Sequence, residues 1–274
     1  MNDSAPELSI VVPAYNEAEN LPILVSEIRK ALSWANSNYE ILLVDDASTD
    51  ATRGVIQQLV TASDRIRAIR HASNQGQSTA LVSGFDRARG AIVITLDADL
   101  QNDPADIPRL LEQLDDCDVV CGVRASRQDS WLRKVSSRIA NGTRNWVTSE
   151  AITDVGCSLR AYRAEFLRYL PVFDGMHRFL PTLLRLNGAR VREIEVNHRP
   201  RRFGSSKYGV HNRLWRGIAD LFGVRWLQAR WIDRSAAEEQ YARPIDAPSP
   251  KEPEPLSARH SPETPVTGNR GEPD

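Results

Sequence analysis

The sequence predicts an α/β fold with a mainly parallel central sheet that is covered by helices on both faces. Short apolar runs alternate with amphipathic stretches along the first half of the chain, and several of these runs are rich in β-branched residues and end at aspartate or proline. Strands that alternate with helices in this way need right-handed crossovers, which place the strands parallel. A chain of 274 residues is long enough to bury a sizeable core around such a sheet.

The elements of the first half follow in order. Residues 8–12 read as a strand of β-branched residues that ends at Pro13. Within 16–34, apolar residues recur at helical spacing, and a second strand at 41–44 stops at two aspartates. Ser48, Thr49 and Asp50 offer N-caps for a helix to about residue 59. The same alternation predicts strands at 66–69, 91–96 and around 119–120, with helices at 76–89 and 104–114.

The second half is expected to hold helices near 131–147, 164–170 and 178–186, a strand at 190–196 and an amphipathic helix at 213–231. Eight of the 16 prolines fall in 235–274, and a segment of this composition is expected to be disordered. The predicted organisation is a flexible N-terminus at 1–7, two halves of one domain at 8–125 and 126–212, an amphipathic helix at 213–234 and a disordered tail at 235–274.

The composition is that of an ordinary folded protein, with 41% hydrophobic and 26% charged residues and a net charge of −1. Cys117, Cys121 and Cys157 give no disulfide framework, which indicates a reducing, cytoplasmic setting. Residues 1–7 lack the features of a signal peptide, and no apolar run is long enough to predict a membrane span.

Acidic residues follow two of the predicted strands. Asp97 and Asp99 come after 91–96, and Asp45 and Asp46 come after 41–44. Burying an unpaired carboxylate costs on the order of several kcal/mol, so the pair at 97–99 should face a cation, a basic group or water. Oxygen ligands set this close suit Mg²⁺ or Mn²⁺, and the alternative is a solvated acidic loop. Because ligands bind outside the carboxyl ends of parallel strands, both acidic pairs should share one edge of the sheet.

Two further motifs suggest recognition of a nucleoside diphosphate. In P-A-Y-N-E at 13–17, Tyr15 can present its ring to a base and Glu17 its carboxylate to a ribose, while the alternative is that Tyr15 only packs. In R-R-F-G-S-S-K at 201–207, Arg201 and Lys207 can close over a diphosphate and neutralise its charge. The alternative for this run is a solvated basic loop or a nonspecific attraction to lipid.

Together these motifs resemble glycosyltransferase family 2, whose members have the GT-A fold. The resemblance covers roughly 8–230 and rests on V-V-P-A-Y-N-E, L-V-D-D-A-S-T-D, N-Q-G-Q-S-T-A-L at 74–81 and L-D-A-D-L-Q, which stand in the family's order. R-Q-D-S-W-L-R-K at 127–134 and D-V-G-C-S-L-R-A-Y-R at 154–163 make the chain most similar to the polyprenyl-phosphate sugar transferases, and among these to undecaprenyl-phosphate formamido-arabinose transferases more than to dolichol-phosphate mannose synthases.

The resemblance implies an inverting transferase that moves a sugar from a UDP- or GDP-sugar to polyprenyl phosphate and uses Mg²⁺ or Mn²⁺. It also implies a Rossmann-like half that binds the nucleotide-sugar at 8–125 and a half that binds the acceptor at 126–212. The residues that it places around the nucleoside are Pro13, Tyr15, Glu17, Val44, Asp45 and Asp46. Asp97 and Ala98 would line the nucleotide-sugar site, and Asp99 and Gln101 would bind the metal.

The basic residues and Asp154 receive roles from the same resemblance. Arg124 would reach the sugar or the acceptor phosphate, Arg178 stands where related synthases carry a basic residue, and Arg201 and Lys207 would be phosphate clamps. Asp154 is the candidate general base, although a role in positioning Arg160 or Arg163 is favoured, because a phosphomonoester acceptor is largely a dianion at neutral pH. His177 and His198 lack zinc-ligand spacing and are expected to be structural or to contact the acceptor.

Relatives in this family often carry C-terminal transmembrane helices, whereas this sequence shows a basic amphipathic segment at 213–231. Residues 198–234 contain nine Lys and Arg against two Asp. The residues expected on one helical face are Leu214, Ile218, Leu221 and Phe222, with Trp215, Trp226 and Trp231 nearby. This pattern predicts an interfacial helix on an anionic membrane surface and a peripheral location on its cytoplasmic face, and the alternative is a helix that packs in the core.

Two other functions compete with this one. The first is a family 2 transferase that acts on a soluble or growing glycan. The second is a noncatalytic binding subunit, against which the complete D-A-D-L-Q and R-x-x-G-x-S-K motifs argue. No nucleic-acid partner is expected, the formamido-arabinose-like stretches favour UDP over GDP, and the sequence leaves the sugar and the oligomeric state open.

Overall fold

The computed structural model describes residues 5–33, 38–124, 152–202 and 210–232, together with the helical residues 142, 145 and 148. All of them belong to the first of two units, 1–236 and 237–274, into which the chain divides. The tail predicted at 235–274, most of the helix predicted at 131–147, and Lys207 lie outside the described residues.

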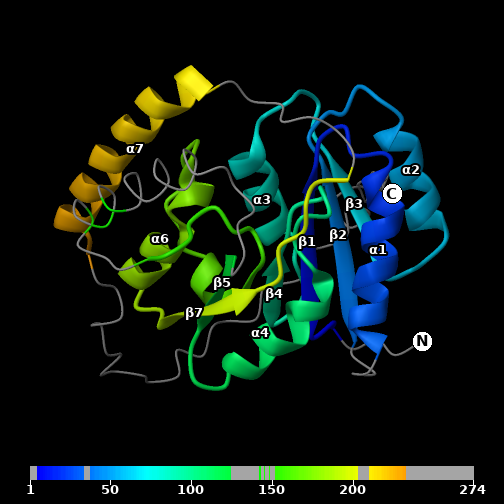
Figure 1. Cartoon of the computed structure of the whole chain (residues 1–274), viewed down its shortest axis with the longest axis horizontal. Helices are drawn as coiled ribbons and strands as arrows, with labels where there is room; N and C mark the ends of the chain where they lie inside the picture. Colours follow the sequence, from blue (N-terminus) through cyan, green and yellow to red (C-terminus); the bar gives the residue numbers. More distant parts are fainter. Residues whose placement is uncertain are drawn as a thin grey trace, which may run out of the picture. The chain divides into compact units, whose positions relative to one another are not determined.

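A seven-stranded sheet forms the centre of this unit, with the strand order β3-β2-β1-β4-β6-β5-β7 (Figure 1). The strands are β1 (Leu8–Ala14), β2 (Tyr39–Asp45), β3 (Ile66–Arg70), β4 (Ile92–Thr95), β5 (Val119–Arg124), β6 (Arg160–Arg163) and β7 (Val191–Val196). β3, β2, β1 and β4 are parallel neighbours, and β5 and β7 are parallel to each other. The predicted α/β fold with a mainly parallel sheet is therefore confirmed.

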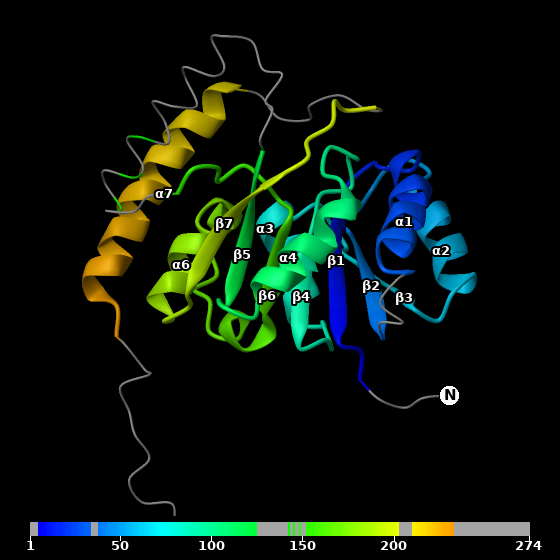
Figure 2. The same ribbon diagram turned by 60° about the horizontal axis from the view of Figure 1, so that its bottom comes forward.

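Side chains of the central strands alternate between two cores, as the period of two in a strand requires. In β1, Ile10 and Val12 belong to one core and Val11 to the other. The first core also holds residues of α1 (Asn20–Ala31), α2 (Thr52–Thr61) and α4 (Ile107–Gln113). The second holds residues of α3 (Gln77–Phe85), α6 (Leu180–Leu186) and α7 (Val210–Arg230). Helices thus cover both faces of the sheet (Figure 2).

The sequence does not predict β6, which lies antiparallel between β4 and β5 and makes the sheet a mixed one. Its four residues, R-A-Y-R, include two arginines and do not resemble a central strand. Arg160 is nevertheless buried, because its guanidinium donates to the backbone carbonyls of Val155 at 2.7 Å and His177 at 3.0 Å. The carbonyls that accept these hydrogen bonds lie outside the strand, so the residue pattern of 160–163 does not reveal that Arg160 is buried.

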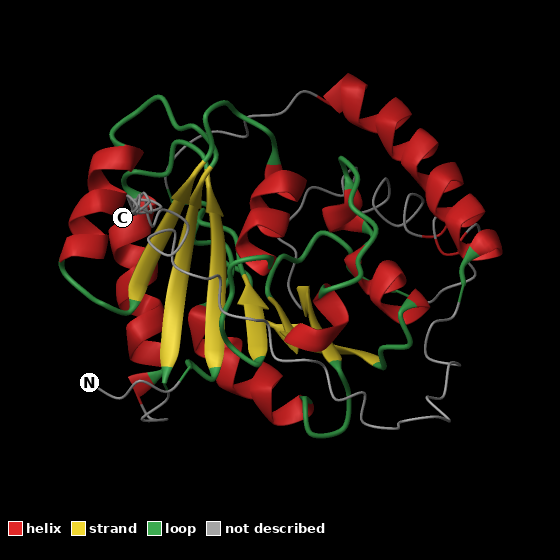
Figure 3. Cartoon of the chain, turned by 180° about the vertical axis from the view of Figure 1, so that it is seen from behind, coloured by secondary structure: helices red, strands yellow, loops and turns green. Residues whose placement is uncertain are grey.

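Several helices begin later or end earlier than the sequence predicts. α1 starts at Asn20 instead of residue 16, with Pro22 in its first turn, where the missing N–H costs no hydrogen bond. Residues 15–19 therefore stay in the loop that follows β1. The segments Pro104–Asp106, Ala164–Leu167 and Met176–Arg178 are short 3₁₀ turns, and α4 and α6 begin after the first and the last of them. Figure 3 shows the long parallel strands pointing toward one edge of the sheet, which is the edge where the loop at 15–19 leaves β1.

Gly90 offers a test of the packing around β1. Its N–H donates to Ser9 Oγ at 2.8 Å, and an added Cβ would lie 2.6 Å from Ser9 N and 2.7 Å from Leu8 C. We expect Gly90→Ala to lower the free energy of unfolding by on the order of 1–3 kcal/mol, because backbone atoms must move apart. Urea unfolding followed by circular dichroism would measure the change.

Gly54→Ala is the matched control, because Gly54 lies in α2 and an added Cβ meets nothing within 4 Å. This substitution should stabilise the protein by roughly 0.5–1 kcal/mol. Equal effects of the two substitutions would contradict the close approach at Gly90.

Candidate functional site

Three loops meet at the carboxyl-terminal edge of the sheet. They follow the parallel neighbours β1, β2 and β4, so residues 45–46 and 97–99 share one edge, as predicted. Each loop contains a non-glycine residue with a left-handed backbone, namely Asn16 at φ 55°, Ala47 at φ 59° and Leu100 at φ 62°. This conformation has an energetic cost and is found most often at functional sites. The edge therefore holds a specific and strained loop geometry.

Asp46 organises the loop that leads into α3. Its carboxylate accepts hydrogen bonds from the backbone N–H groups of Gln75 and Gly76, both at 2.8 Å, and lies 2.7 Å from Nδ1 of His71. Gly76 has a φ of 86°, which residues with a side chain rarely adopt. With these partners Asp46 shapes the start of α3, and its place around the nucleoside stays a prediction from the resemblance.

Asp45 keeps a free acceptor within the described part of the chain. Its Oδ1 accepts a hydrogen bond from the Ser48 N–H at 2.8 Å. Its Oδ2 is buried, makes no hydrogen bond there, and lies 3.5 Å from Nη1 of Arg70. A buried carboxylate oxygen without a hydrogen bond is costly. This oxygen is therefore suited to accept an N–H from a ligand.

The loop after β1 is fastened to the loop after β2. The Asn16 N–H donates to Ser48 Oγ at 2.9 Å, and the Glu17 N–H donates to Thr52 Oγ1 at 2.8 Å. These bonds join residues more than 30 positions apart. They place the aromatic and acidic residues of P-A-Y-N-E next to the Asp45–Asp46 pair.

Of the other residues predicted around the nucleoside, Pro13 and Tyr15 are partly exposed at this edge. Val44 pairs with Pro13 in the sheet, but its side chain is fully buried in the second core. Val44 therefore stabilises the strand that carries these loops, and its side chain does not reach the surface where a ligand would bind.

Asp97 and Asp99 are held by different partners. Oδ1 of Asp97 accepts a hydrogen bond from Nε2 of Gln77 at 2.8 Å, and Oδ2 of Asp99 accepts one from Nη2 of Arg201 at 2.7 Å. Asp99 is only 8% exposed and the intervening Ala98 is buried, so the alternative of a solvated acidic loop is wrong. Burial and the neighbouring charge of Asp99 raise the pKa of Asp97 to about 6.

Gln77 and Ser158 are site residues to which the sequence assigned no role. Ser158 Oγ accepts hydrogen bonds from the Asp97 N–H at 3.0 Å and from Nδ2 of Asn102 at 2.7 Å. Both residues lie inside the motifs at 74–81 and 154–163, which is the one signal that could have found them.

The donors available for a metal ion at this edge are few. Within the described ranges, no group of three or more His, Cys, Asp or Glu is placed to hold an ion. The acidic pair and Gln101 remain, and because burial and the charge of Asp99 raise the pKa of Asp97, a divalent cation beside the pair would offset the repulsion. Mg²⁺ is commonly held by one or two carboxylates together with waters and substrate phosphates. The residues therefore fit an ion that is shared with a ligand.

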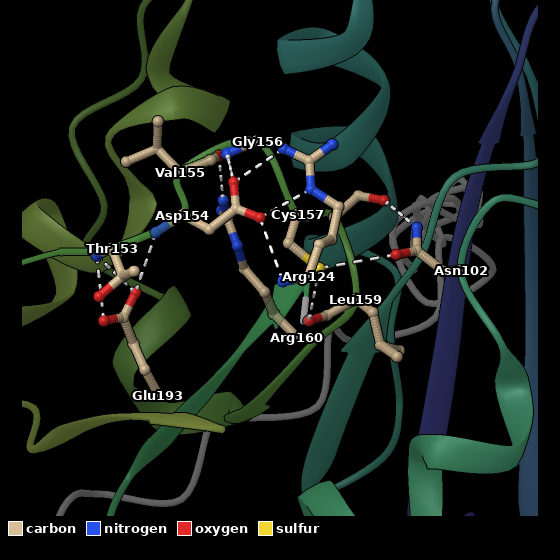
Figure 4. Close-up of polar contacts among 11 residues, drawn as sticks. Asn102, Arg124, Thr153, Asp154, Val155, Gly156, Cys157, Leu159, Arg160 and Glu193 are labelled. Carbon is tan, nitrogen blue, oxygen red and sulfur yellow. Dashed lines mark hydrogen bonds and ion pairs between the residues drawn. The ribbon is translucent and has the colours of Figure 1, made fainter. Parts of the chain in front are cut away.

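Asp154 is paired with Arg124, not with Arg160 or Arg163 (Figure 4). Oδ2 of Asp154 accepts from Nε of Arg124 at 2.7 Å and Oδ1 accepts from Nη2 at 2.8 Å, which is a bidentate, charge-assisted pair. The carboxylate also accepts the N–H groups of Arg124 and Gly156, at 3.2 and 3.1 Å, and Asp154 is only 5% exposed. With its oxygens bonded in this way, Asp154 fixes the direction of Arg124, and a role as general base loses support.

The remaining predicted residues have contacts elsewhere in the fold. Arg178 donates to Asp220 of α7 at 2.7 Å and so joins the turn Met176–Arg178 to that helix. Nδ1 of His177 lies 2.8 Å from Ser78 Oγ at the start of α3. His198 forms an isolated antiparallel bridge with Asn102. These contacts give the two histidines structural partners.

Comparison with known proteins bears on the residues just described. The family model described as "Glycosyl transferase family 2" matches residues 9–170. Undecaprenyl-phosphate 4-deoxy-4-formamido-L-arabinose transferase of Aeromonas hydrophila is 39% identical over 213 residues, which are 77% of this chain and 65% of that protein. The enzyme of the same name from Sodalis glossinidius is 42% identical over 206 residues, or 74% of this chain and 63% of that protein. The chain thus spans less than two thirds of the length of these relatives.

Solved structures share the fold at low sequence identity. The mannosyltransferase PcManGT from Pyrobaculum calidifontis, in complex with GDP-Man and Mn²⁺, superposes with a TM-score of 0.58 at 20% identity and covers 83% of this chain and 65% of that chain. Glucosyl-3-phosphoglycerate synthase from Mycobacterium tuberculosis, in complex with Mn²⁺, UDP and phosphoglyceric acid, gives a TM-score of 0.62 at 18% identity, with 84% and 80% covered.

The raised pKa of Asp97 makes stability depend on pH. The folded state holds a proton on Asp97 up to about pH 6, whereas the unfolded state releases it near pH 4, so stability falls as pH rises through this window. Asp97→Asn removes that loss. In EDTA, we expect the variant to gain on the order of 1–3 kcal/mol over the wild type between pH 4 and pH 7.5. Urea unfolding at both pH values measures the gain, and a difference that does not change with pH would contradict it.

Proposed function

The chain belongs to glycosyltransferase family 2, and from this premise we propose that it transfers a sugar from a nucleotide-sugar, with UDP favoured, to polyprenyl phosphate. The observation that carries the proposal is the meeting of the three loops after β1, β2 and β4 with Arg201 at one edge of the sheet. Relatives about 40% identical over three quarters of the chain are named for undecaprenyl phosphate, which supports the acceptor class.

The donor would occupy the edge of the sheet. Oδ2 of Asp45 is suited to accept the imide N–H of a uracil base, since it is buried and makes no hydrogen bond within the described residues. Tyr15 and Glu17 lie in the adjoining loop and would contact the base and the ribose. Asp97, which is partly exposed, and the backbone of Ala98, whose side chain is buried, would line the site under the diphosphate and the sugar.

A divalent cation fits the acidic loop, where Asp99 and Gln101 would hold it. Bound there, Mg²⁺ or Mn²⁺ acts as a Lewis acid that stabilises the departing nucleoside diphosphate. Arg201 donates to the same carboxylate of Asp99 in the structure, so it stands where it can turn to phosphate oxygens. Arg201 and Lys207 would then neutralise the leaving group, although Lys207 lies outside the described residues.

The acceptor needs little help from a base. The second pKa of a phosphomonoester is about 6, so the polyprenyl phosphate is largely a dianion at neutral pH and can attack the anomeric carbon directly. Arg124, which Asp154 holds in place, would bind the acceptor phosphate or the sugar. Displacement of the nucleoside diphosphate from the opposite side inverts the anomeric centre, so an α-linked donor would yield a β-linked lipid phosphate.

α7 offers a surface for the membrane in which such a lipid resides. Leu221 and Val224 are buried, whereas Phe222 and Trp226 are 66% and 63% exposed. Leu221 and Phe222 therefore do not share a face as predicted, because successive residues of a helix are turned by about 100°. One side of α7 packs in the core, as the core-packing alternative expects, and the interfacial alternative stays a proposal for the exposed side. Arg225 and Arg230 are also exposed, and apolar rings flanked by arginines suit an anionic lipid surface.

Within the described residues, no helix has both the length and the apolar character needed to cross a membrane.

The proposed function is tested by a transfer assay with a radiolabelled UDP-sugar, undecaprenyl phosphate and Mn²⁺ in detergent. We expect label to move into the organic phase and the movement to stop in EDTA. Asp99→Asn should lower the rate by roughly 100-fold or more, because the variant loses a charged ligand of the ion.

Asp116→Asn serves as the control, since Asp116 is exposed and paired with Arg192 away from the acidic loop. Label that appears in a water-soluble glycan would favour the alternative acceptor. Full activity of Asp99→Asn, or transfer in EDTA, would sink the metal assignment.

The proposed membrane surface is tested by removing its two exposed rings. We expect Phe222→Ser together with Trp226→Ser to weaken binding to anionic vesicles by roughly 100-fold or more, because each ring loses about 1.5–3 kcal/mol of burial in the interface. Turnover on a short, water-soluble prenyl phosphate should remain.

Tyr169→Ser is the matched control, since Tyr169 is 64% exposed but lies outside α7. Vesicle sedimentation at low and high salt measures the binding. Unchanged sedimentation of the double variant would place the lipid surface elsewhere.

A further inference from the structure

The segment 197–202, here called the strap, follows β7 and runs along the loop 99–106 at the carboxyl-terminal edge of the sheet (Figure 1). The two segments run antiparallel, because residues later in the strap bond to residues earlier in the loop. The contacts are Asn197 N–H to Asp106 at 2.7 Å, the bridge between His198 and Asn102, Arg199 N–H to the Gln101 carbonyl at 2.8 Å, and Arg201 to Asp99 at 2.7 Å.

Arg199 makes the strongest set of bonds in the strap. Its Nη1 donates to both carboxylate oxygens of Glu27 in α1, at 2.9 and 2.8 Å, and its Nη2 lies 2.6 Å from Oδ2 of Asp103. Its side chain is 29% exposed, so solvent screens these ion pairs only in part. Through its backbone N–H the same residue also holds the carbonyl of Gln101. Arg199 therefore connects the strap to α1 and to the loop 99–106.

We propose that Arg199 is a positioning residue that holds the loop 99–103 in the geometry needed to bind a divalent cation, an inference that rests on the proposed function. The strap contacts both proposed ligands directly, through Arg201 at Asp99 and through the Arg199 N–H at the Gln101 carbonyl. Leu100, between them, has a left-handed backbone that needs external support. Groups that orient metal ligands in this way typically contribute about 10–100-fold to metal affinity.

The sign of the effect separates positioning from simple electrostatics. Arg199 is a cation near an acidic site, so its charge alone repels a metal ion, and removing that charge would tighten binding. If Arg199 instead holds the ligands in place, its removal weakens binding although a repulsive charge is lost. Asp103→Asn cannot make this distinction alone, because loss of an acid weakens cation binding under either account.

The experiment measures the Kd for Mn²⁺ alone by electron paramagnetic resonance of the free ion, on the full chain and without nucleotide. Arg199→Gln should weaken Mn²⁺ binding by roughly ten-fold, and Arg199→Lys, which can reach only one of the two carboxylates, by a smaller factor. Arg199→Gln combined with Asp103→Asn should weaken binding by less than the product of the two single effects, because one of the contacts of Arg199 is with Asp103 itself. Thermal unfolding confirms that each variant is folded.

Arg192→Gln is the matched control, since Arg192 is an exposed arginine of β7 that contacts Gln113 and Asp116. It should bind Mn²⁺ as the wild type does. Folded Arg199→Gln or Arg199→Lys with unchanged or tighter affinity, while the wild type binds Mn²⁺, would overturn the positioning role and leave the proposed function standing. If Arg199→Gln does not fold, the Lys variant decides. Absence of Mn²⁺ binding by the wild type would overturn this inference, while the transfer assay in EDTA would still test the proposed function.

Discussion

The placement of two like charges next to each other at the end of β4, one of them buried, is the constraint on which the arrangement of this site depends. Asp97 and Asp99 stand two residues apart at a place where Asp99 is only 8% exposed, and burial with mutual repulsion raises the pKa of Asp97 to about 6. Such a pair is stable only if donors and cations surround it. The fold supplies them from two distant segments, through Gln77 of α3 and Arg201 of the strap, while Ser158 before β6 accepts the backbone N–H of Asp97.

This compensation links the two halves of the chain. Gln77 reaches Asp97 from a helix whose start is shaped by Asp46, and Arg201 reaches Asp99 from a strap that Arg199 anchors to α1. The acidic pair is therefore bonded both to the helix whose start Asp46 shapes and to the strap that carries Arg201. A cation bound at Asp99 would replace Arg201 as the positive charge beside this carboxylate. Arg201 would then be free to bind the phosphates of the donor.

The sequence predicts those parts of the fold and site that local patterns determine. β-branched runs reveal the strands, and the rule for parallel strands places 45–46 and 97–99 at one edge. What it misses depends on contacts between distant residues. β6 is missed because Arg160 is a charged residue that becomes buried only when loop carbonyls accept its hydrogen bonds. Asp154 pairs with Arg124, and the spacing of the two residues in the sequence does not reveal this. Val44 packs into the core, although its motif suggested a contact with the ligand. Likewise, the split of Leu221 and Phe222 between core and solvent depends on what α7 packs against.

The central claim is that the acids after β4 hold a cation shared with a nucleoside diphosphate, and that Arg201 yields its place to that cation. Anomalous diffraction from crystals grown with Mn²⁺ and UDP tests it most directly. The account predicts one manganese peak within coordination distance of the Asp99 carboxylate and a UDP phosphate, with Arg201 moved from Asp99 to the diphosphate. UDP bound without manganese at Asp99, or manganese at Asp99 with the Arg201 pair intact, would contradict it.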